Sequence, residues 1–588
     1  MSSSMAAMGY VLKAPESLDG LRIRIESVER HLSNFYGCPL DRHWIGDSRS
    51  GLVYWSTTER DVDWEFFARR GDEAVMWIGV PGFAGGPETG VDAFKLGRQV
   101  LDGDRLAEDM GCPFAVLGWR EGNVFVANDV YGLARVFRFD LAEGDIWTTR
   151  PGMAHIFMAE PARKNEVAWS SMAALGWSLR GETQLGRGRQ VPPGTRLRAW
   201  YGAEGQVQIS ELNEFRAWFQ DARSRELPDA RAMAGGMGHY IDVARRWPLQ
   251  ATADLSGGKD SRAIAAVGIA AGSISRLRTI DTDPEEARVA CELISRVNGA
   301  VHHHIEGKQP SPRPVEVMRS NLLSQHRAWE GRYLAPTGFN AGAFKGFRLA
   351  QAARFNGLGG EVSNGGNLLD SWADRLTGQE IGAGLDRMSA MARTSGGASK
   401  LAREHVRQLL EEWGEAARHL GLSTAHQVLD LIYAWDRMPN WSNPYSTPHT
   451  LTPYYSAPLI PVGVQRVGAA VHDGTSQKEL ISASMPQWRG IPFYKGPRAA
   501  RKTPFIWELE NWPAVRDMIR ARAGESNSFD ADSLPGLLSR ISDGSAGKRD
   551  EVLIHRVLWE VTFEDYLVEL NAQIDDTRKE LEALKGSC

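Results

Sequence analysis

Short apolar stretches separated by Gly, Pro and Asp make up the first 205 residues of the chain. Residues 74–82, 114–132 and 134–140 are examples of such strand-like stretches. Apolar runs of this length, bounded by turn-forming residues, are typical of β-strands, and the sequence REGN at 120–123 suits a hairpin turn. We therefore expect an antiparallel β sandwich-type domain over residues 1–205.

The pattern changes after residue 205. Residues 206–232 are charged and helix-prone, which suits a connecting helix or linker between two domains. Residues 233–588 form the second expected domain, in which strand-like and helix-like runs follow one another in regular succession. Such succession predicts a parallel α/β sheet, and beyond residue 340 the pattern is largely helical. The strands are expected at 247–256, 276–281 and 301–306, and the helices at 260–271 and 284–299.

Composition and charge exclude several classes of protein. With 588 residues the chain is too long for a single core, and its net charge of −5 offers no basic surplus for nucleic acid or an anionic membrane. No apolar run is long enough to cross a membrane, and the first residues lack the pattern of a secretory signal. The four cysteines lack the spacing of a zinc site or a disulfide framework. We expect a cytoplasmic protein with no nucleic-acid or membrane partner.

A strand-to-helix corner carries the clearest chemical signal. Residues 256–261 read SGGKDS, between a predicted strand and a predicted helix. Glycines let the backbone approach an anion closely, serines add hydroxyl donors, and a helix N-terminus favours negative charge. Asp260 would repel a polyphosphate unless a cation lay between them, so its presence implies Mg²⁺. The alternative is that Ser256 or Asp260 caps the helix while the glycines form a tight turn.

The string SGGKDS resembles the pyrophosphate loop of ATP pyrophosphatases, in the SGGxDS form of the asparagine synthetase family. The resemblance implies a degenerate, Ntn-like glutamine amidotransferase domain, followed by a PP-loop ATP pyrophosphatase domain with a helical C-terminal part. Members use ATP to adenylate a carboxylate, release pyrophosphate and let an amine attack. Further segments similar to the family follow in its order and extend over nearly the whole chain: 127–139, 185–198, 279–304, 356–366, 452–461 and 501–505.

The resemblance also implies the residues of the site. Mg²⁺ would be shared by Asp260 and by Glu361, which stands where the family has an aspartate. Lys502 is the preferred cation for stabilising charge at the acyl-adenylate, with Lys495 as its rival. The residues expected to hold ATP and pyrophosphate are Leu255, Ser256, Gly257, Gly258, Lys259, Asp260, Ser261, Ile280, Asp281, Gly357, Gly359 and Gly360.

Three consecutive histidines suggest a metal site, but the sequence favours another interpretation. Successive residues of a strand face opposite sides, so only His302 and His304 could converge. The family has a histidine-rich third strand at this place without a metal. We therefore expect no metal ion there.

The sequence departs from the family at four places. It begins MSSS, and its first cysteine, Cys38, is expected deep inside the sheet domain, so we expect no glutaminase activity and a scaffold role for this domain. Asn128 stands where the family has an arginine. Leu358 replaces the glutamate of asparagine synthetase and the tyrosine of β-lactam and carbapenam synthetases. Arg262 follows the loop, where its guanidinium could reach a phosphate, a substrate carboxylate or an acidic neighbour.

These features together favour an ATP-dependent, AMP-forming amide-bond synthetase that takes its amine from a substrate. β-Lactam synthetases and lasso-peptide cyclases are of this kind, so lactam or macrolactam formation, or ligation, in natural product biosynthesis is expected. The sequence leaves open whether the substrate is a small molecule or a peptide, whether a leader-peptide-binding partner takes part, and whether the chain forms a homo-oligomer. Two alternatives are asparagine synthesis from free ammonia and a non-catalytic nucleotide-binding protein.

Overall fold

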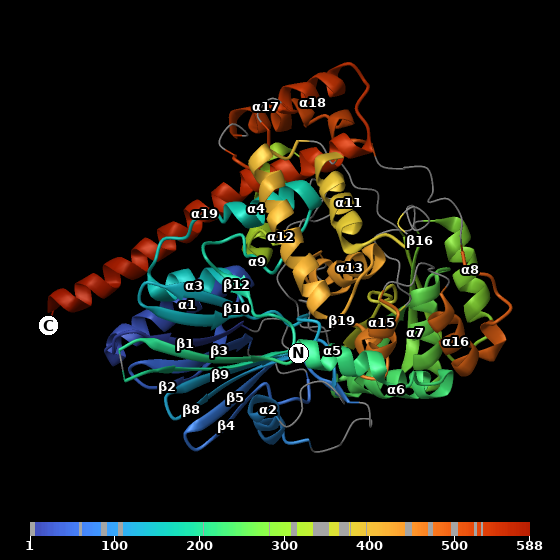
Figure 1. Cartoon of the computed structure of the whole chain (residues 1–588), viewed down its shortest axis with the longest axis horizontal. Coiled ribbons are helices and arrows are strands. Elements are labelled where there is room, and N and C mark those ends of the chain that lie inside the picture. The colour runs from blue at the N-terminus through green and yellow to red at the C-terminus, as the bar shows by residue number, and fades with distance from the viewer. Residues whose placement is uncertain are drawn as a thin grey trace.

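The structure is a computed structural model, and it contains a β sandwich, a parallel sheet and a group of helices between and above them (Figure 1). Antiparallel sheets come first in the chain and the parallel sheet second, as predicted. The described residues are 6–57, 62–83, 91–103, 110–203, 205–281, 283–306, 314–332, 352–363, 376, 378–394, 397–441, 450–467, 474–494, 504–522, 526–530 and 533–587.

The N-terminal domain consists of two antiparallel six-stranded sheets. The first sheet has the order β12 (Arg189–Gln190), β10 (Phe137–Leu141), β11 (Gly144–Thr148), β1 (Ala6–Leu12), β3 (Ser50–Thr57), β2 (Leu40–Gly46). The second has the order β14 (Val207–Asn213), β13 (Thr195–Tyr201), β9 (Asn123–Asn128), β8 (Ala115–Arg120), β5 (Glu73–Ile78), β4 (Phe67–Arg70). A short pair, β6 (Gly82–Phe83) and β7 (Met110–Gly111), lies apart from them.

Successive side chains of β1 point alternately to the two faces of its sheet, and both faces are buried. Met8 and Tyr10 point to one face, where they share a buried cluster with helix α1 (Leu18–Tyr36) and helix α3 (Pro151–Met158). Ala7 and Val11 point to the other face and pack against residues of the second sheet. Helix α2 (Ala93–Asp102) covers the outer face of that second sheet. Helices therefore lie outside both sheets, an arrangement consistent with the predicted Ntn-like domain.

The predicted hairpin is present, and the domain boundary is not where the sequence suggested. Glu121 and Gly122 join β8 to β9, and both have the positive φ that a two-residue hairpin loop needs. Strand β14 pairs with β13 along its whole length, so the sandwich continues to Asn213. Residues 206–232 are therefore not a connector throughout, as the sequence suggested. Residues 207–213 form a polar strand at the edge of the second sheet instead. Helices α5 (Phe215–Ser224) and α6 (Ala230–Asp242) make the actual connection.

The second domain is built on a five-stranded parallel sheet. Its order is β17 (Val301–Glu306), β16 (Ile274–Asp281), β15 (Leu249–Asp254), β18 (Ala352–Phe355), β19 (Thr450–Leu451). Helices α7 (Lys259–Ala270) and α8 (Pro284–Ile294) connect the first three strands. The chain first adds strands on one side of β15 and then on the other, so the order reverses between β15 and β18. In open α/β sheets, ligands bind beyond the carboxyl ends of strands at such a reversal.

The rest of the described chain is helical, as predicted for the region beyond residue 340. Helix α19 (Lys548–Ser587) packs against α1, α3, α4 (Glu166–Leu175) and α9 (Val315–Trp329) and so ties the end of the chain to the N-terminal domain (Figure 1). Among the described helices, none combines the length and the apolar character needed to cross a membrane. The helices not yet named are α11 (Ile381–Thr394), α12 (Lys400–His419), α13 (Ala425–Ile432), α14 (Met438–Trp441), α15 (Ile460–Gln465), α16 (Thr475–Ser484), α17 (Trp512–Arg522) and α18 (Ser533–Ser542).

A buried ionic network stabilises the junction between the two domains. Glu330, directly after α9, has no exposed side-chain surface. Its Oε1 accepts hydrogen bonds from the Gly152 backbone N–H at 2.8 Å and the Tyr566 hydroxyl at 3.3 Å. The guanidinium groups of Arg150 and Arg332 lie 4.0 and 3.6 Å from its carboxylate. One carboxylate thus compensates two buried cations and joins α3, α9 and α19.

We predict that Glu330→Ala lowers the free energy of unfolding by about 3–5 kcal/mol, because it leaves buried charge without a counter-ion. Denaturant unfolding followed by circular dichroism measures this loss. Glu404→Ala on α12, which removes an exposed partner of Arg407, is the matched control and is expected to leave the unfolding midpoint unchanged. Equal midpoints for the two variants would contradict the role of the network.

Candidate functional site

Two glycine-rich loops meet at the reversal of strand order. One follows β15 and contains Ser256 to Gly258; the other follows β18 and contains residues 356–363. A Cβ atom added to Gly357 would lie 2.9 Å from the Ser261 backbone nitrogen, and one added to Gly360 would collide with the Asp260 carboxylate. Glycine is therefore required at both positions for the loops to touch. The pairing of the two loops was predicted from sequence, and the structure brings them together.

The two carboxylates predicted to bind a cation lie close enough for the charge of Glu361 to act on Asp260. Burial and, to a smaller extent, the negative charge of Glu361 raise the pKa of Asp260 to about 7. Burial likewise raises the pKa of Glu361, while the positive charges of Lys259 and Arg437 act in the opposite direction. Burial disfavours the charged forms of both carboxyl groups, and carboxylate oxygens are the ligands that a hard divalent cation prefers.

Gln477, on α16, holds the two loops together. Its Nε2 donates to Asp260 Oδ1 at 2.6 Å and to the Gly360 carbonyl oxygen at 2.9 Å. The hydroxyl of Tyr454 donates to the Asp260 carbonyl oxygen at 3.0 Å. Sequence reasoning missed both residues. Tyr454 lies within the segment 452–461 that resembles the family, whereas nothing in the local sequence distinguishes Gln477 from an ordinary helix residue.

The serines of the loop form hydrogen bonds within the turn, and neither Ser256 nor Asp260 caps the helix, so the alternative interpretation was wrong about the cap. Ser256 Oγ accepts from the Gly258 N–H at 3.1 Å and lies 2.8 Å from Ser261 Oγ. The N-terminus of α7 itself has no side-chain cap, in contrast to α8, where Asp283 accepts from two backbone N–H groups. Because uncapped N–H groups and the helix dipole favour an anion, the backbone of this turn is the part suited to phosphate.

Arg262 positions the loop through hydrogen bonds to backbone carbonyl oxygens. The residue is 1% exposed, and its guanidinium donates to the carbonyl oxygens of Gly257 at 2.8 Å, Ile491 at 2.8 Å and Pro492 at 3.0 Å. The Tyr494 backbone N–H also donates to the Gly257 carbonyl, at 2.9 Å. Arg262 therefore binds the loop to the segment 491–494. The negative charge of Glu292 also acts on it, while a phosphate or substrate carboxylate as its partner stays a prediction.

The remaining predicted residues have different outcomes. Lys495, Lys502 and residues 364–366 lie outside the described residues, so both candidate lysines stay predictions. Lys259 lies close enough to Asp260 and Glu361 to lower the pKa of both carboxyl groups. At the carboxyl ends of the strands, Leu255 is buried and Ile280 is 47% exposed beside Asp281.

Leu358 forms an apolar wall at the second loop. It is partly buried against a cluster that includes Tyr131, Trp435 and Tyr455, and its N–H donates to Asn356 Oδ1 at 3.1 Å. Gly359 follows it with a φ of 86°, a conformation that favours glycine. The position at which the resemblance expects a polar or acidic side chain is thus packed as part of a hydrophobic core.

The structure of the N-terminal domain differs from the prediction at Cys38. It also gives Asn128 a structural role. Cys38 is partly exposed in the connection between α1 and β2, not deep inside the domain as expected. Asn128 is fully buried, and its amide donates to the carbonyl oxygens of Val191 and Pro192 and accepts from the Thr195 N–H. Its side chain is occupied with three backbone groups of the sandwich.

The raised pKa of Asp260 predicts how stability depends on pH. Between about pH 4, the usual pKa of an aspartate, and about pH 7, the folded protein holds a proton that the unfolded chain releases. Raising the pH through this window in metal-free buffer is therefore expected to lower the free energy of unfolding, by at most about 1.4 kcal/mol per pH unit from this group. Asp260→Asn should flatten the dependence in urea titrations, and an unchanged slope would contradict the assignment.

Comparisons with known proteins leave the family open. No protein-family model and no curated protein matches this sequence. The chain is similar to the allosteric regulatory enzyme of purine biosynthesis, with 10% identity and a TM-score of 0.20, over 53% of this chain and 82% of that one. It is also similar to glutamine phosphoribosylpyrophosphate amidotransferase from B. subtilis complexed with ADP and GMP, with 9% identity and a TM-score of 0.21, over 53% and 83%. At such scores neither likeness carries an argument, and membership of the asparagine synthetase family stays a prediction.

Proposed function

We propose that this protein is an ATP-dependent, AMP-forming amide-bond synthetase without glutaminase activity. One observation carries the proposal: the loops after β15 and β18 meet at the reversal of strand order, where the charge of Glu361 acts on Asp260. The uncapped N-terminus of α7 beside them supplies N–H donors of the kind that bind phosphate. A phosphate-binding turn adjoined by two carboxylates suits a polyphosphate that is bound together with a divalent cation.

The proposed reaction has two steps. In the first, an oxygen of the substrate carboxylate attacks the α-phosphorus of ATP, the bond from that phosphorus to the bridging oxygen breaks, and pyrophosphate leaves. In the second, the amine nitrogen attacks the acyl carbon, the bond to AMP breaks, and the nitrogen loses a proton. If the amine belongs to the same substrate, the second step is intramolecular and gains from proximity.

The chain's own residues would bind and orient these groups. The backbone turn at 256–258 would hold the pyrophosphate, and the exposed Ile280 offers an apolar surface for adenosine at the carboxyl end of β16. Asp260 and Glu361 would hold Mg²⁺, which neutralises phosphate charge when it is bound. Gln477 and Arg262 keep the loops in place. Lys502, with Lys495 as rival, is proposed to stabilise the developing negative charge.

The state of the N-terminal domain favours an amine that comes from a substrate. Cys38 lies in a loop within the chain, where it cannot use its own α-amino group as a base. The network around Glu330 and the packing of α19 against α1 and α3 give this domain a structural role. Cyclisation to a lactam or macrolactam, or ligation of two substrates, in natural product biosynthesis is the class of reaction proposed.

The proposal predicts AMP formation that depends on Asp260. Labelled ATP, Mg²⁺ and pools of carboxylates are incubated with the protein, and the nucleotide products are separated. We expect AMP and pyrophosphate with some pools only. Asp260→Asn is expected to reduce the rate on the order of 10²- to 10³-fold, the usual cost of losing electrostatic stabilisation in a site.

Asp386→Asn, at an exposed position of α11, serves as the matched control and should retain the rate of the unmodified protein. ADP and phosphate as products would overturn the proposed mechanism. ATP binding without turnover of any pool would favour a non-catalytic nucleotide-binding protein, an alternative suggested by Leu358.

A second prediction separates the proposal from asparagine synthesis with free ammonia. With aspartate, ammonia and ATP, neither the unmodified protein nor Leu358→Glu should form asparagine, because residue 358 packs in an apolar cluster. Amino-acid analysis of the reaction mixture measures the product, and an unfolding curve shows that the variant is folded. Asparagine formed by the unmodified protein would rule out this part of the proposal.

A further inference from the structure

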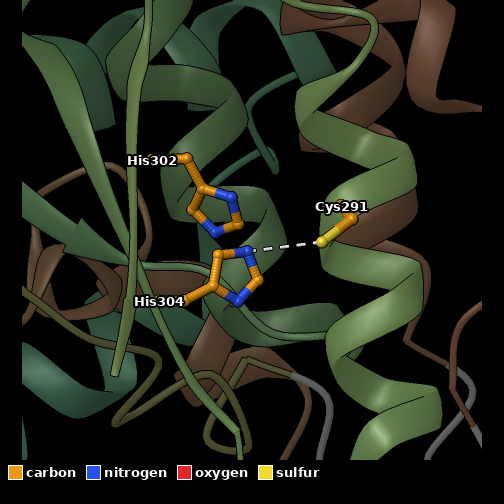
Figure 2. Close-up of side chains that lie close together, drawn as sticks. All are labelled: Cys291, His302 and His304. Atoms are coloured by element: carbon orange, nitrogen blue, oxygen red, sulfur yellow. Dashed lines mark hydrogen bonds between the residues drawn. The ribbon is translucent and has the colours of Figure 1, made fainter. Parts of the chain in front are cut away.

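A cysteine and two histidines converge beside the edge strand of the parallel sheet (Figure 2). His302 and His304 are two residues apart on the edge strand β17, so their side chains lie on the same side of it. Cys291 faces them from α8. Among the described residues, these three form a group whose potential ligand atoms all lie within 4.8 Å of one another.

The distances suit a tetrahedral metal ion with nitrogen and sulfur ligands. Cys291 Sγ lies 3.4 Å from His304 Nε2. Zinc–sulfur and zinc–nitrogen bonds of about 2.3 and 2.0–2.1 Å at a tetrahedral angle place the two ligand atoms about 3.6 Å apart. The present separation therefore needs only a small adjustment to accept the ion.

A second hydrogen-bonded residue orients one of the ligands. The Thr279 hydroxyl donates to the Leu255 carbonyl oxygen at 2.8 Å, and it lies 2.8 Å from His302 Nε2. Since the hydroxyl has a single proton, His302 Nε2 is the donor in the second bond, which leaves Nδ1 as the nitrogen with a lone pair for a metal. Such outer hydrogen bonds commonly hold metal-binding histidines.

The ligand set also determines the class of ion. It contains no carboxylate, so it does not suit Mg²⁺, whereas thiolate and imidazole are the ligands preferred by Zn²⁺ and similar ions. Cys291 and His304 are exposed, which gives the ion a path of entry and leaves a fourth position for water or an external ligand. His303, between the two histidines, points to the opposite face.

We infer that Cys291, His302 and His304 form a three-ligand site for Zn²⁺ or another thiolate-preferring divalent ion. The thiol loses its proton when the ion binds, so the Sγ–H bond is replaced by a bond to the metal and the proton goes to solvent. The site is independent of the proposed synthetase reaction. It is linked to the candidate site through Thr279, whose hydroxyl holds the carbonyl of Leu255, directly before the turn at 256–258.

Titration of the full chain with Co²⁺, after removal of any affinity tag and of bound metal, tests the inference. We expect one equivalent to bind with a thiolate-to-cobalt charge-transfer band and the intense visible bands of a four-coordinate ion. Added Zn²⁺ should remove these bands. Cys291→Ser should abolish the charge-transfer band, and His302→Ala and His304→Ala should weaken binding by more than the roughly 10- to 100-fold cost of losing an outer partner.

His303→Ala is the matched control, because it removes an imidazole from the same strand without removing a ligand, and it should bind Co²⁺ as the unmodified protein does. Asp260→Asn should also retain the bands, which separates this site from the pyrophosphate turn. Absence of stoichiometric binding would overturn the inference. A charge-transfer band that persists in Cys291→Ser would also overturn the inference. Equal losses of Co²⁺ affinity in His303→Ala and His304→Ala would overturn it too, since a simple thiol–imidazole hydrogen bond would then account for the contact.

Discussion

The position of β15 between β16 and β18 is the constraint on which the candidate site depends. Because strands are added first on one side of β15 and later on the other, the loops after β15 and β18 face each other. Their contact requires glycine at 357 and 360, because a Cβ at either place would meet the backbone of Ser261 or the carboxylate of Asp260. Burial at this contact and, to a smaller extent, the negative charge of Glu361 raise the pKa of Asp260 to about 7. The reversal of strand order, the contact between the two loops and the raised pKa of Asp260 therefore all occur at the same point of the sheet.

The surroundings of this point are held mainly by bonds to backbone groups. Arg262 donates to three carbonyl oxygens, and Gln477 bridges the two loops. Burying charged or amide groups is costly, and the hydrogen bonds that they form offset this cost, so these residues favour one arrangement of the loops. Glu330 plays the same part for the junction with the sandwich.

The two cation sites that we propose on this sheet differ in the ions that they would prefer. Asp260 and Glu361 present oxygen atoms at the reversal of strand order, whereas Cys291, His302 and His304 present sulfur and nitrogen beside the edge strand. Hard and thiolate-preferring ions would therefore not compete for one site. Thr279 lies between the two places, with one hydrogen bond toward His302 and one toward Leu255.

The sequence alone determined the order of elements, the antiparallel and parallel classes of sheet, the hairpin at Glu121–Gly122 and the pairing of the two glycine loops. These features depend on local periodicity, turn residues and short motifs. Tertiary structure decided that β14 belongs to the sandwich, that Arg262 binds backbone carbonyls, and that Gln477 reaches Asp260 over 217 positions of the chain. It also brought Cys291 close to His302 and His304, where the sequence analysis expected no metal ion. Contacts between residues far apart in the chain have no local signature, because they depend on how helices pack against a sheet whose strand order is not encoded in any one segment.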